Sequence, residues 1–323
     1  MEDLILAIDQ GTSSTKALLM NANAQIMGEG IADLETTYFA NGQVEQDPYA
    51  ILASVEKAVR ACVEGIDIEQ IKSIGISNQR ETFILWNAKG EPVFPAVVWA
   101  CKRSTQICDD LKEQNEWIQE KTGLMIDPYF SGSKVLWITQ NHPEIKSQIE
   151  AGEIYFGTVD TWILFKLTEG KSYLTDLSNA SRTLFFNLQT LDWDQEILQK
   201  WGLSQLNLPQ LKRSSDDFGS TDLFGLSKNP IQIGAMIGDS HASMFGETCF
   251  EEGDTKMTLG TGCSLLMSVG NSQKKSKNGL LSTIGWSTQN QVVYAWEGAI
   301  VACGSMVEWL KNSASSDVVS FLR

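Results

Sequence analysis

Two segments far apart in the chain share one pattern, and this repetition constrains the fold more than any other feature. Residues 4–20 (LILAIDQGTSSTKALLM) and 255–268 (TKMTLGTGCSLLMS) each combine an apolar strand, a turn of glycine and hydroxyl side chains, and a second apolar strand. Backbone N–H groups and hydroxyls can converge on an anion at such a tight turn. The pair predicts two related halves that close on one polyphosphate, and it favours nucleotide binding.

Length, charge and cysteine usage narrow the class of protein. A chain of 323 residues suits two domains better than one core. The formal net charge of -15 argues against a nucleic-acid partner, because phosphate backbones require clustered Lys and Arg. No apolar run reaches the roughly 18 residues of a membrane span, and no secretion signal is recognisable. Six cysteines without C-x-x-C pairing predict buried reduced thiols in a cytoplasmic protein.

The first 95 residues alternate strand and helix signals. Strands are expected at 25–37, 71–77 and 82–86, and the continuous apolar run at 71–77 is typical of a sheet covered on both faces. A helix is expected to begin at Asp47-Pro48, with Asp as N-cap and Pro at the first helical position.

The middle of the chain reads as helical. We expect residues 101–202 to form a helical insertion that covers the first sheet, with helices at 104–114, 133–140, 161–168 and 194–202. A strand at 231–237 and a helix at 239–249 should follow. Beyond the second hairpin, strands are expected at 280–286 and 292–296, and a helix at 300–310.

These elements predict a domain over residues 1–248 and the start of a second over 249–323. A second domain that matched the first would need far more than the roughly seventy residues after Gly253. The second domain is therefore expected to be incomplete.

The turn after the first strand carries candidate phosphate ligands. The chain has no G-x-x-x-x-G-K-[ST] loop, so a nucleotide site must have another design. Asp9 ends an apolar strand directly before this turn and could hold Mg²⁺ through water, since that ion prefers one or two carboxylates plus phosphate oxygens. Lys16 could add a point charge. The alternative is an ordinary turn aspartate and an exposed lysine.

Two further polar groups lie next to apolar strands. Asp239 follows the strand at 231–237 and opens a helix, so it is either a helix-terminal carboxylate or a general base at the carboxyl end of a parallel strand. The quartet Asn78-Gln79-Arg80-Glu81 separates two apolar strands. An Arg-Glu pair is often a surface ion pair of little energetic value, but an unbroken polar quartet between buried strands favours binding.

With these residues in place, the chain resembles the FGGY carbohydrate kinase family, and within it the glycerol kinases. The resemblance runs along the whole chain, through DQGTSST, SNQRET, VVWACKR, GLMIDPYFSGSKVLWI, FGTVDTWILFKLTEG, TDLSNASRTLFFNLQTLDWD and GTGCSLLM. It implies an α/β, actin-like ATPase (ribonuclease H-like) fold with two domains that flank a cleft. It also implies phosphorylation of a small polyol by Mg²⁺ and ATP, with glycerol as the expected substrate and glycerol 3-phosphate as the product.

The resemblance assigns roles to individual residues. Arg80 and Glu81 are similar to the pair that binds the polyol hydroxyls, Trp99 to the aromatic wall against its carbon chain, and Tyr129 to another hydroxyl partner. Asp239 resembles the general base. The first phosphate turn would use Thr12, Ser13, Ser14 and Lys16, and the second Gly260 and Thr261.

The chain departs from the glycerol kinase pattern at three positions. Ser240 and His241 stand where two glutamines are usual, the first of which contacts substrate, and Ser264 stands where a phenylalanine packs on glycerol. These changes open space for a longer or more polar polyol, or for water. Another polyol or a ketose therefore remains an alternative substrate, and a catalytically silent nucleotide- or sugar-binding protein an alternative function. Relatives commonly form homo-oligomers, and self-association is expected of the full-length protein.

Overall fold

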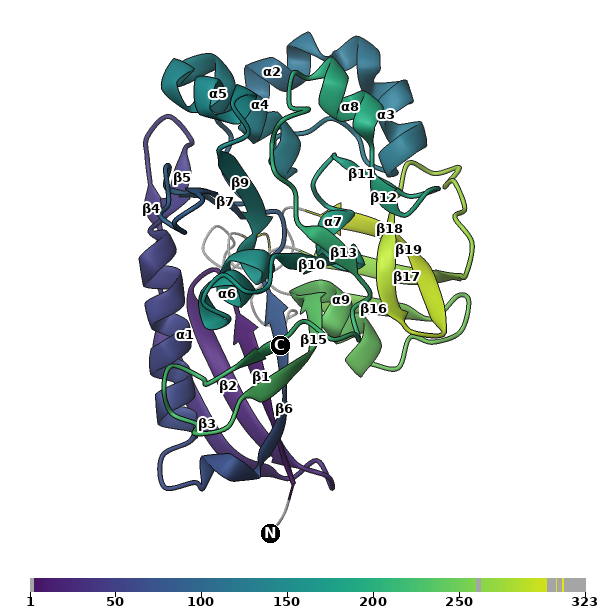
Figure 1. The fold of residues 1–323 in the computed structure, drawn as a ribbon. Coiled ribbons are helices and arrows are strands. Elements are labelled where there is room, and N and C mark those ends of the chain that lie inside the picture. Colours follow the sequence, from purple (N-terminus) through teal and green to yellow (C-terminus); the bar gives the residue numbers. More distant parts are fainter. Residues whose placement is uncertain (1–2, 260–262, 301–305, 307–309, 311–323) are drawn as a thin grey trace.

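The computed structural model describes residues 3–259 and 263–300, together with Met306 and Leu310. Within these residues the chain forms a mixed α/β structure with one six-stranded, one five-stranded and one four-stranded sheet (Figure 1). Two small two-stranded sheets connect them, β10 (Leu174–Asp176) with β13 (Gln210–Lys212) and β11 (Phe186–Asn187) with β12 (Asp192–Trp193).

The six-stranded sheet contains the predicted first hairpin. Its order is β14 (Ser220–Thr221), β15 (Ile231–Gly238), β6 (Ile71–Asn78), β1 (Leu4–Gln10), β2 (Ser14–Asn21) and β3 (Ile26–Asp33). β1 and β2 pair antiparallel, whereas β6 runs parallel to both β1 and β15. The three parallel strands therefore end at one edge of the sheet.

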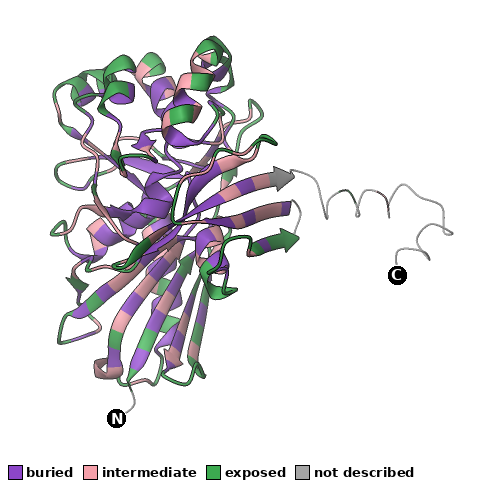
Figure 2. Cartoon of the chain, turned by 90° about the vertical axis from the view of Figure 1, so that its right-hand side faces the viewer, coloured by how far each residue is buried: buried purple, intermediate pink, exposed green. Residues whose placement is uncertain are grey.

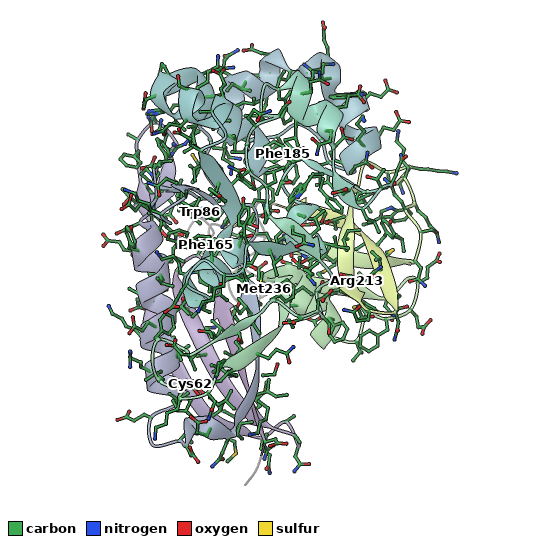
Figure 3. All side chains as sticks on the ribbon, viewed as in Figure 1. Cys62, Trp86, Phe165, Phe185, Arg213 and Met236 are labelled. Carbon is green, nitrogen blue, oxygen red and sulfur yellow. The ribbon has the colours of Figure 1, made fainter. Side chains whose placement is uncertain are left out.

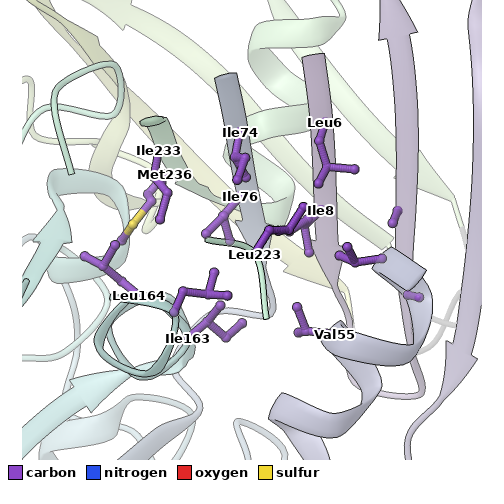
Figure 4. Close-up of a cluster of buried hydrophobic side chains, with 14 of the residues drawn as sticks. Leu6, Ile8, Val55, Ile74, Ile76, Ile163, Leu164, Leu223, Ile233 and Met236 are labelled. Carbon is purple, nitrogen blue, oxygen red and sulfur yellow. The ribbon is translucent and has the colours of Figure 1, made fainter. Parts of the chain in front are cut away.

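One face of this sheet carries the main core. α1 (Pro48–Cys62) begins at the predicted N-cap Asp47, which accepts a hydrogen bond from the Tyr49 N–H. It packs on the sheet beside α6 (Val159–Leu167). Figure 4 shows isoleucine and leucine side chains of β1, β6 and β15 facing Ile163 and Leu164 of α6. Burial of this apolar face is the main force that holds the two helices on the sheet.

The opposite face of the sheet is more open than the sequence suggests. Along β6 every buried residue alternates with exposed or half-buried ones, and Ile5 of β1 is 48% exposed. Figure 2 shows this alternation as bands along the strands. The strand at 71–77 was correctly expected, but the prediction that both its faces are covered is wrong, because its outward positions carry Ser73, Gly75 and Ser77 rather than apolar side chains.

The five-stranded sheet has the order β4 (Thr37–Tyr38), β5 (Val44–Gln46), β8 (Ala96–Val97), β7 (Phe83–Asn87) and β9 (Ile154–Thr158). Its core includes residues of α2 (Thr105–Asp110), α3 (Asn115–Thr122), α4 (Ser131–Asn141), α5 (Pro143–Glu150) and α8 (Gln195–Lys200). Trp86 of β7 packs on Phe165 of α6 with ring centroids 5.5 Å apart, so the two cores adjoin (Figure 3).

This arrangement corrects the expectation of a helical insertion over the first sheet. Residues 101–202 also contain β9, β10, β11 and β12, and most of their helices cover the second sheet. Of the four helices predicted there, only α6 packs on the first sheet. The sequence pattern located these four helices but did not indicate which sheet each one covers, since an amphipathic helix can pack its apolar face on either sheet.

The four-stranded sheet begins with the second hairpin and has the order β16 (Thr255–Leu259), β17 (Cys263–Gly270), β19 (Gln291–Ile300) and β18 (Leu281–Thr288). β16 and β17 pair antiparallel as predicted, while their turn at 260–262 lies outside the described residues, as does most of the helix expected at 300–310. Short α7 (Leu177–Ala180) contacts this sheet through β18, and α9 (Asp239–Gly246) lies between it and β15. In the described part of the chain, no helix is long and apolar enough to cross a membrane.

Candidate active site

The candidate site lies at the edge where the parallel strands of the first sheet end. Gln10 of β1 and Gly238 of β15 are both register partners of Asn78 at the end of β6. The residues after these strands therefore meet, as is usual at the carboxyl edge of a parallel sheet. This geometry brings Thr12, the 79–81 segment and Asp239 together although they are far apart in the sequence.

A pocket of about 190 Å³ opens at this edge. All six predicted substrate residues line it, namely Arg80, Glu81, Trp99, Tyr129, Asp239 and Ser240. The other lining residues are Thr12 of the first turn, Gln79, and Ser264 and Glu297 of the four-stranded sheet. A larger hollow of about 700 Å³ beside Phe165 and Glu169 contains none of the predicted site residues. The chemistry of the lining, rather than size, identifies the smaller pocket as the candidate site.

Arg80 and Glu81 are not a surface ion pair. Both are buried, and each pairs with a partner elsewhere in the chain. The two terminal nitrogens of Arg80 donate to the two oxygens of Glu297, each at 3.0 Å, and Nε of Arg182 donates to Glu81 at 2.6 Å. Glu81 has a left-handed backbone (φ 61°), and Ser131 donates to its carbonyl. Strained, firmly held backbones of this kind are typical of functional positions.

Asp239 is the first residue of α9, and its carboxylate faces the pocket with 45% of the side chain exposed. Its Oδ1 lies 3.4 Å from Nε of Arg80 and accepts the Ser240 N–H at 2.6 Å. Burial raises the pKa of Asp239, and the charge of Asp9 raises it further, against the opposing effect of Arg80. A partly enclosed carboxylate with a raised pKa accepts a proton more readily than an ordinary aspartate.

Two aromatic residues form a wall of the pocket. Trp99 and Tyr129 pack edge to face with centroids 5.7 Å apart, and the Trp99 indole N–H donates to the Thr12 hydroxyl at 2.9 Å. Buried Lys134 donates to the carbonyls of both residues at 3.1 Å. Burial raises the pKa of Tyr129, so its hydroxyl keeps its proton and can donate a hydrogen bond.

The remaining residues of the first turn lie nearer the surface. Asp9 is exposed and accepts a hydrogen bond from the Ser77 hydroxyl at 2.7 Å. Ser13 and Lys16 are exposed and Ser14 is half-buried, while Gly260 and Thr261 lie outside the described residues. Among the residues described, no cluster of three or more His, Cys, Asp or Glu is placed to hold a metal ion. Asp9 nevertheless fits Mg²⁺, which needs only one or two carboxylates when phosphate oxygens supply the rest.

The three positions that depart from the glycerol kinase pattern have different environments. Ser240 and Ser264 both line the pocket. His241 is fully buried beneath it, and burial together with the nearby charge of Arg80 holds its pKa well below the usual range. His241 is therefore a neutral side chain behind the pocket wall, whereas the two serines can affect the substrate directly.

The sequence analysis missed Glu297 and Arg182. Glu297 lies on β19, one residue past the predicted end of that strand at residue 296. Arg182 lies in a segment whose residues from 175 to 186 are all buried. A charged residue inside an otherwise apolar or small-residue segment could have indicated Arg182 as a functional or structural residue, because a buried charge requires a partner.

Comparisons with known proteins show the family to which the chain belongs. Residues 4–246 match the FGGY family of carbohydrate kinases, N-terminal domain. Glycerol kinase 2 of Thermotoga maritima is 45% identical over 315 residues, which cover 95% of this chain and 63% of that protein, and glycerol kinase of Vibrio parahaemolyticus is 41% identical over 313 residues, 95% and 62%. The crystal structure of Plasmodium falciparum glycerol kinase with ADP has a TM-score of 0.89 at 35% identity, and covers 96% of this chain and 64% of that chain. This chain thus spans less than two thirds of these relatives.

Proposed function

Because this chain belongs to the FGGY family of carbohydrate kinases, we propose that it transfers the terminal phosphoryl group of ATP to a small polyol. The substrate that its relatives favour is glycerol, and the product would be glycerol 3-phosphate. One observation carries the proposal: an accessible carboxylate, an arginine, a second carboxylate and two aromatic side chains converge on one pocket at the carboxyl edge of the first sheet. The domain boundary at 248/249 and self-association remain predictions.

Different side chains of the pocket would bind the polyol and accept its proton. Arg80, Glu81 and Tyr129 would hold polyol hydroxyls through hydrogen bonds, and the Trp99 ring would pack on the carbon chain. Asp239 would take the proton of the attacking hydroxyl as its oxygen bonds to phosphorus and ADP departs. Phosphoryl transfer requires alignment and charge neutralisation more than covalent help, which this arrangement suits.

Residues of the two turns would bind the nucleotide phosphates. Thr12, Ser13, Ser14 and Lys16 are proposed for the first turn, and Gly260 and Thr261 for the second. Asp9 would hold Mg²⁺, an ion that neutralises phosphate charge when bound. The carboxylates of Asp9 and Asp239 are near enough for the charge of one to raise the pKa of the other.

A second candidate substrate class has specific support. Ser240 and Ser264 line the pocket with small hydroxyl side chains and leave room beside the aromatic wall. A polyol longer than glycerol, or a ketose, could occupy that room and bond to the two hydroxyls.

A coupled assay of ADP release tests the proposal. Purified protein is given MgATP and, separately, glycerol, erythritol, xylulose, ribulose or gluconate. We expect turnover with glycerol; a higher kcat/KM with erythritol or a ketose would establish the second class. Absence of turnover with every alcohol, despite ATP binding by calorimetry, would favour the catalytically silent alternative.

A further inference from the structure

Glu297 belongs to the second hairpin sheet, yet its carboxylate is bound by two arginines from other parts of the fold. Its two oxygens accept hydrogen bonds from the two terminal nitrogens of Arg80, each at 3.0 Å, and its Oε2 also lies 2.7 Å from Nη1 of Arg182. All three side chains are at most 5% exposed. The surrounding positive charge outweighs burial, so Glu297 is held ionised with its pKa well below the usual range.

Two of the proposed polyol-binding side chains, Arg80 and Glu81, depend on this carboxylate. Arg80 is oriented by Glu297 directly, and its remaining Nε points to Asp239 at 3.4 Å. Glu81 is oriented through Arg182, whose Nε donates to it at 2.6 Å. Bidentate and charge-assisted contacts fix geometry more firmly than neutral hydrogen bonds. One residue of the four-stranded sheet therefore fixes the orientation of Arg80 and Glu81 at the edge of the six-stranded sheet.

The same ion pairs also determine which charged groups a bound substrate would face in the pocket. Arg80 and Arg182 bring two positive charges, against three carboxylates from Glu81, Asp239 and Glu297. Asp9 and Lys256, which carry opposite charges, also act on Asp239. Buried Lys134 lies behind the aromatic wall, where its ammonium group donates to the carbonyls of Trp99 and Tyr129. The bidentate face of Arg80 is occupied by Glu297, so a substrate carboxylate finds no free pair of guanidinium N–H groups and instead faces the carboxylates of Glu81 and Asp239. Hydroxyl groups, in contrast, find carboxylate acceptors.

We infer that Glu297 is a positioning residue that orients Arg80 and, through Arg182, Glu81, and that it makes the pocket select uncharged polyols over sugar acids. The inference rests on the proposed function of the same pocket. It differs from a purely structural role, in which Glu297 would only join two sheets, because it predicts a change in substrate preference as well as in stability.

Glycerol and glycerate form a matched pair for the test, since they differ only in whether one terminal carbon is an alcohol or a carboxylate. Their kcat/KM values are measured for the unaltered protein, Glu297→Gln, Glu297→Asp and the control Glu252→Gln, which removes an exposed carboxylate from the same part of the chain. Thermal melts show whether each variant is folded.

We expect the unaltered protein to favour glycerol over glycerate by about 100-fold or more. In Glu297→Gln the KM for glycerol should rise about tenfold, the KM for ATP should stay within about twofold, and the glycerate-to-glycerol ratio of kcat/KM should rise about tenfold. Glu297→Asp keeps the charge and should preserve the preference for glycerol. The control should match the unaltered protein.

The outcomes separate the two proposals. Absence of turnover with every alcohol would remove the proposed function, and this inference with it. Turnover of glycerol and glycerate with similar kcat/KM by the unaltered protein would overturn the inference alone. So would a folded Glu297→Gln variant that lowers kcat for both substrates equally with an unchanged KM. If Glu297→Gln does not fold, the glycerate-to-glycerol ratio of kcat/KM is compared between the unaltered protein and Glu297→Asp. A low ratio in both supports the inference, and a ratio near one in either contradicts it.

Discussion

Asp239 is the proposed general base, and its contacts hold it at the pocket. Its carboxylate is open to the pocket, while Arg80 and the Ser240 N–H fix its orientation. The sequence left two interpretations open, a helix-terminal carboxylate and a base. Asp239 is the first residue of α9 and also faces the pocket, so its position at the helix terminus is compatible with a role as base.

Asp239→Asn should lower kcat by about 10²–10⁴-fold, because the amide cannot accept the proton of the attacking hydroxyl. The KM for ATP should change little. Steady-state kinetics with glycerol measure the effect, and Asp109→Asn, an exposed position on α2, is the control. A normal kcat in Asp239→Asn would remove this residue from the mechanism.

The contact between α1 and β3 depends on two glycines. A Cβ on Gly30 would lie 2.0 Å from the Ala58 carbonyl oxygen and 2.7 Å from the Cys62 nitrogen, and a Cβ on Gly28 would lie 2.1 Å from the Cys62 oxygen. These are backbone atoms of the helix and cannot rotate away. The missing side chains therefore let α1 lie directly on the strand.

Gly30→Ala should lower the free energy of unfolding by about 1–3 kcal/mol or more, since the helix must move off the sheet. Gly246→Ala is the matched control: its added Cβ has no neighbour within 4 Å, so the change should be neutral or slightly stabilising. Denaturant unfolding of both variants measures the difference. Equal stabilities would show that α1 does not require the close approach.

α6 begins beside a buried carboxyl group, Asp160, which accepts hydrogen bonds from Thr158 at 2.5 Å and Thr175 at 2.7 Å. Burial and the charge of Asp176 raise its pKa from the ordinary 3.8 to about 6. Between these two values the folded protein holds a proton that the unfolded chain releases. This group's contribution to stability is therefore present at low pH and is lost as the pH rises through that window.

The pH dependence of Asp160→Asn tests this sign. The shift from 3.8 to about 6 corresponds to at most about 3 kcal/mol, so the variant should gain up to that amount relative to the unaltered protein between about pH 4 and pH 7. Unfolding free energies at several pH values measure the difference. A difference independent of pH would show that Asp160 does not titrate in this range.

The buried ion pairs connect parts of the molecule that are distant in sequence. Arg80 and Glu297 are 217 residues apart, and Arg182 forms ion pairs with both Glu81 and Glu297. Removing one member leaves a buried charge without a partner. The free-energy cost of that unpaired charge exceeds the stabilisation that the intact pair provides.

Arg182→Met should lower the free energy of unfolding by about 3–5 kcal/mol, because Glu81 and Glu297 each lose a partner. Arg60→Met is the control, since Arg60 pairs with Glu56 at the surface and should contribute less than about 1 kcal/mol. Chemical denaturation of the two variants compares them. Similar small losses would show that the buried network is not needed for stability.

Much of the fold follows from local patterns. The hairpins at 4–20 and 255–268, the N-cap at Asp47 and the strand that leads to Asp239 were all predicted at nearly the observed bounds. β9 was missed inside a region that reads as helical, and so were α3 and α5. Pro143 at the first turn of α5 was a usable start signal, because its missing N–H suits a helix N-terminus.

For the candidate site, the residue types and their positions directly after apolar strands were sufficient to nominate Asp239, Arg80 and Glu81. Strand periodicity and local hydrogen bonding depend on residues that are close in sequence, so the sequence itself shows them. The partners of those residues were not predictable. Glu297 and Arg182 are brought to them by the pairing of strands and the docking of one sheet against another. Electrostatic contacts depend on distance in space and on burial, and both arise only when the chain has folded.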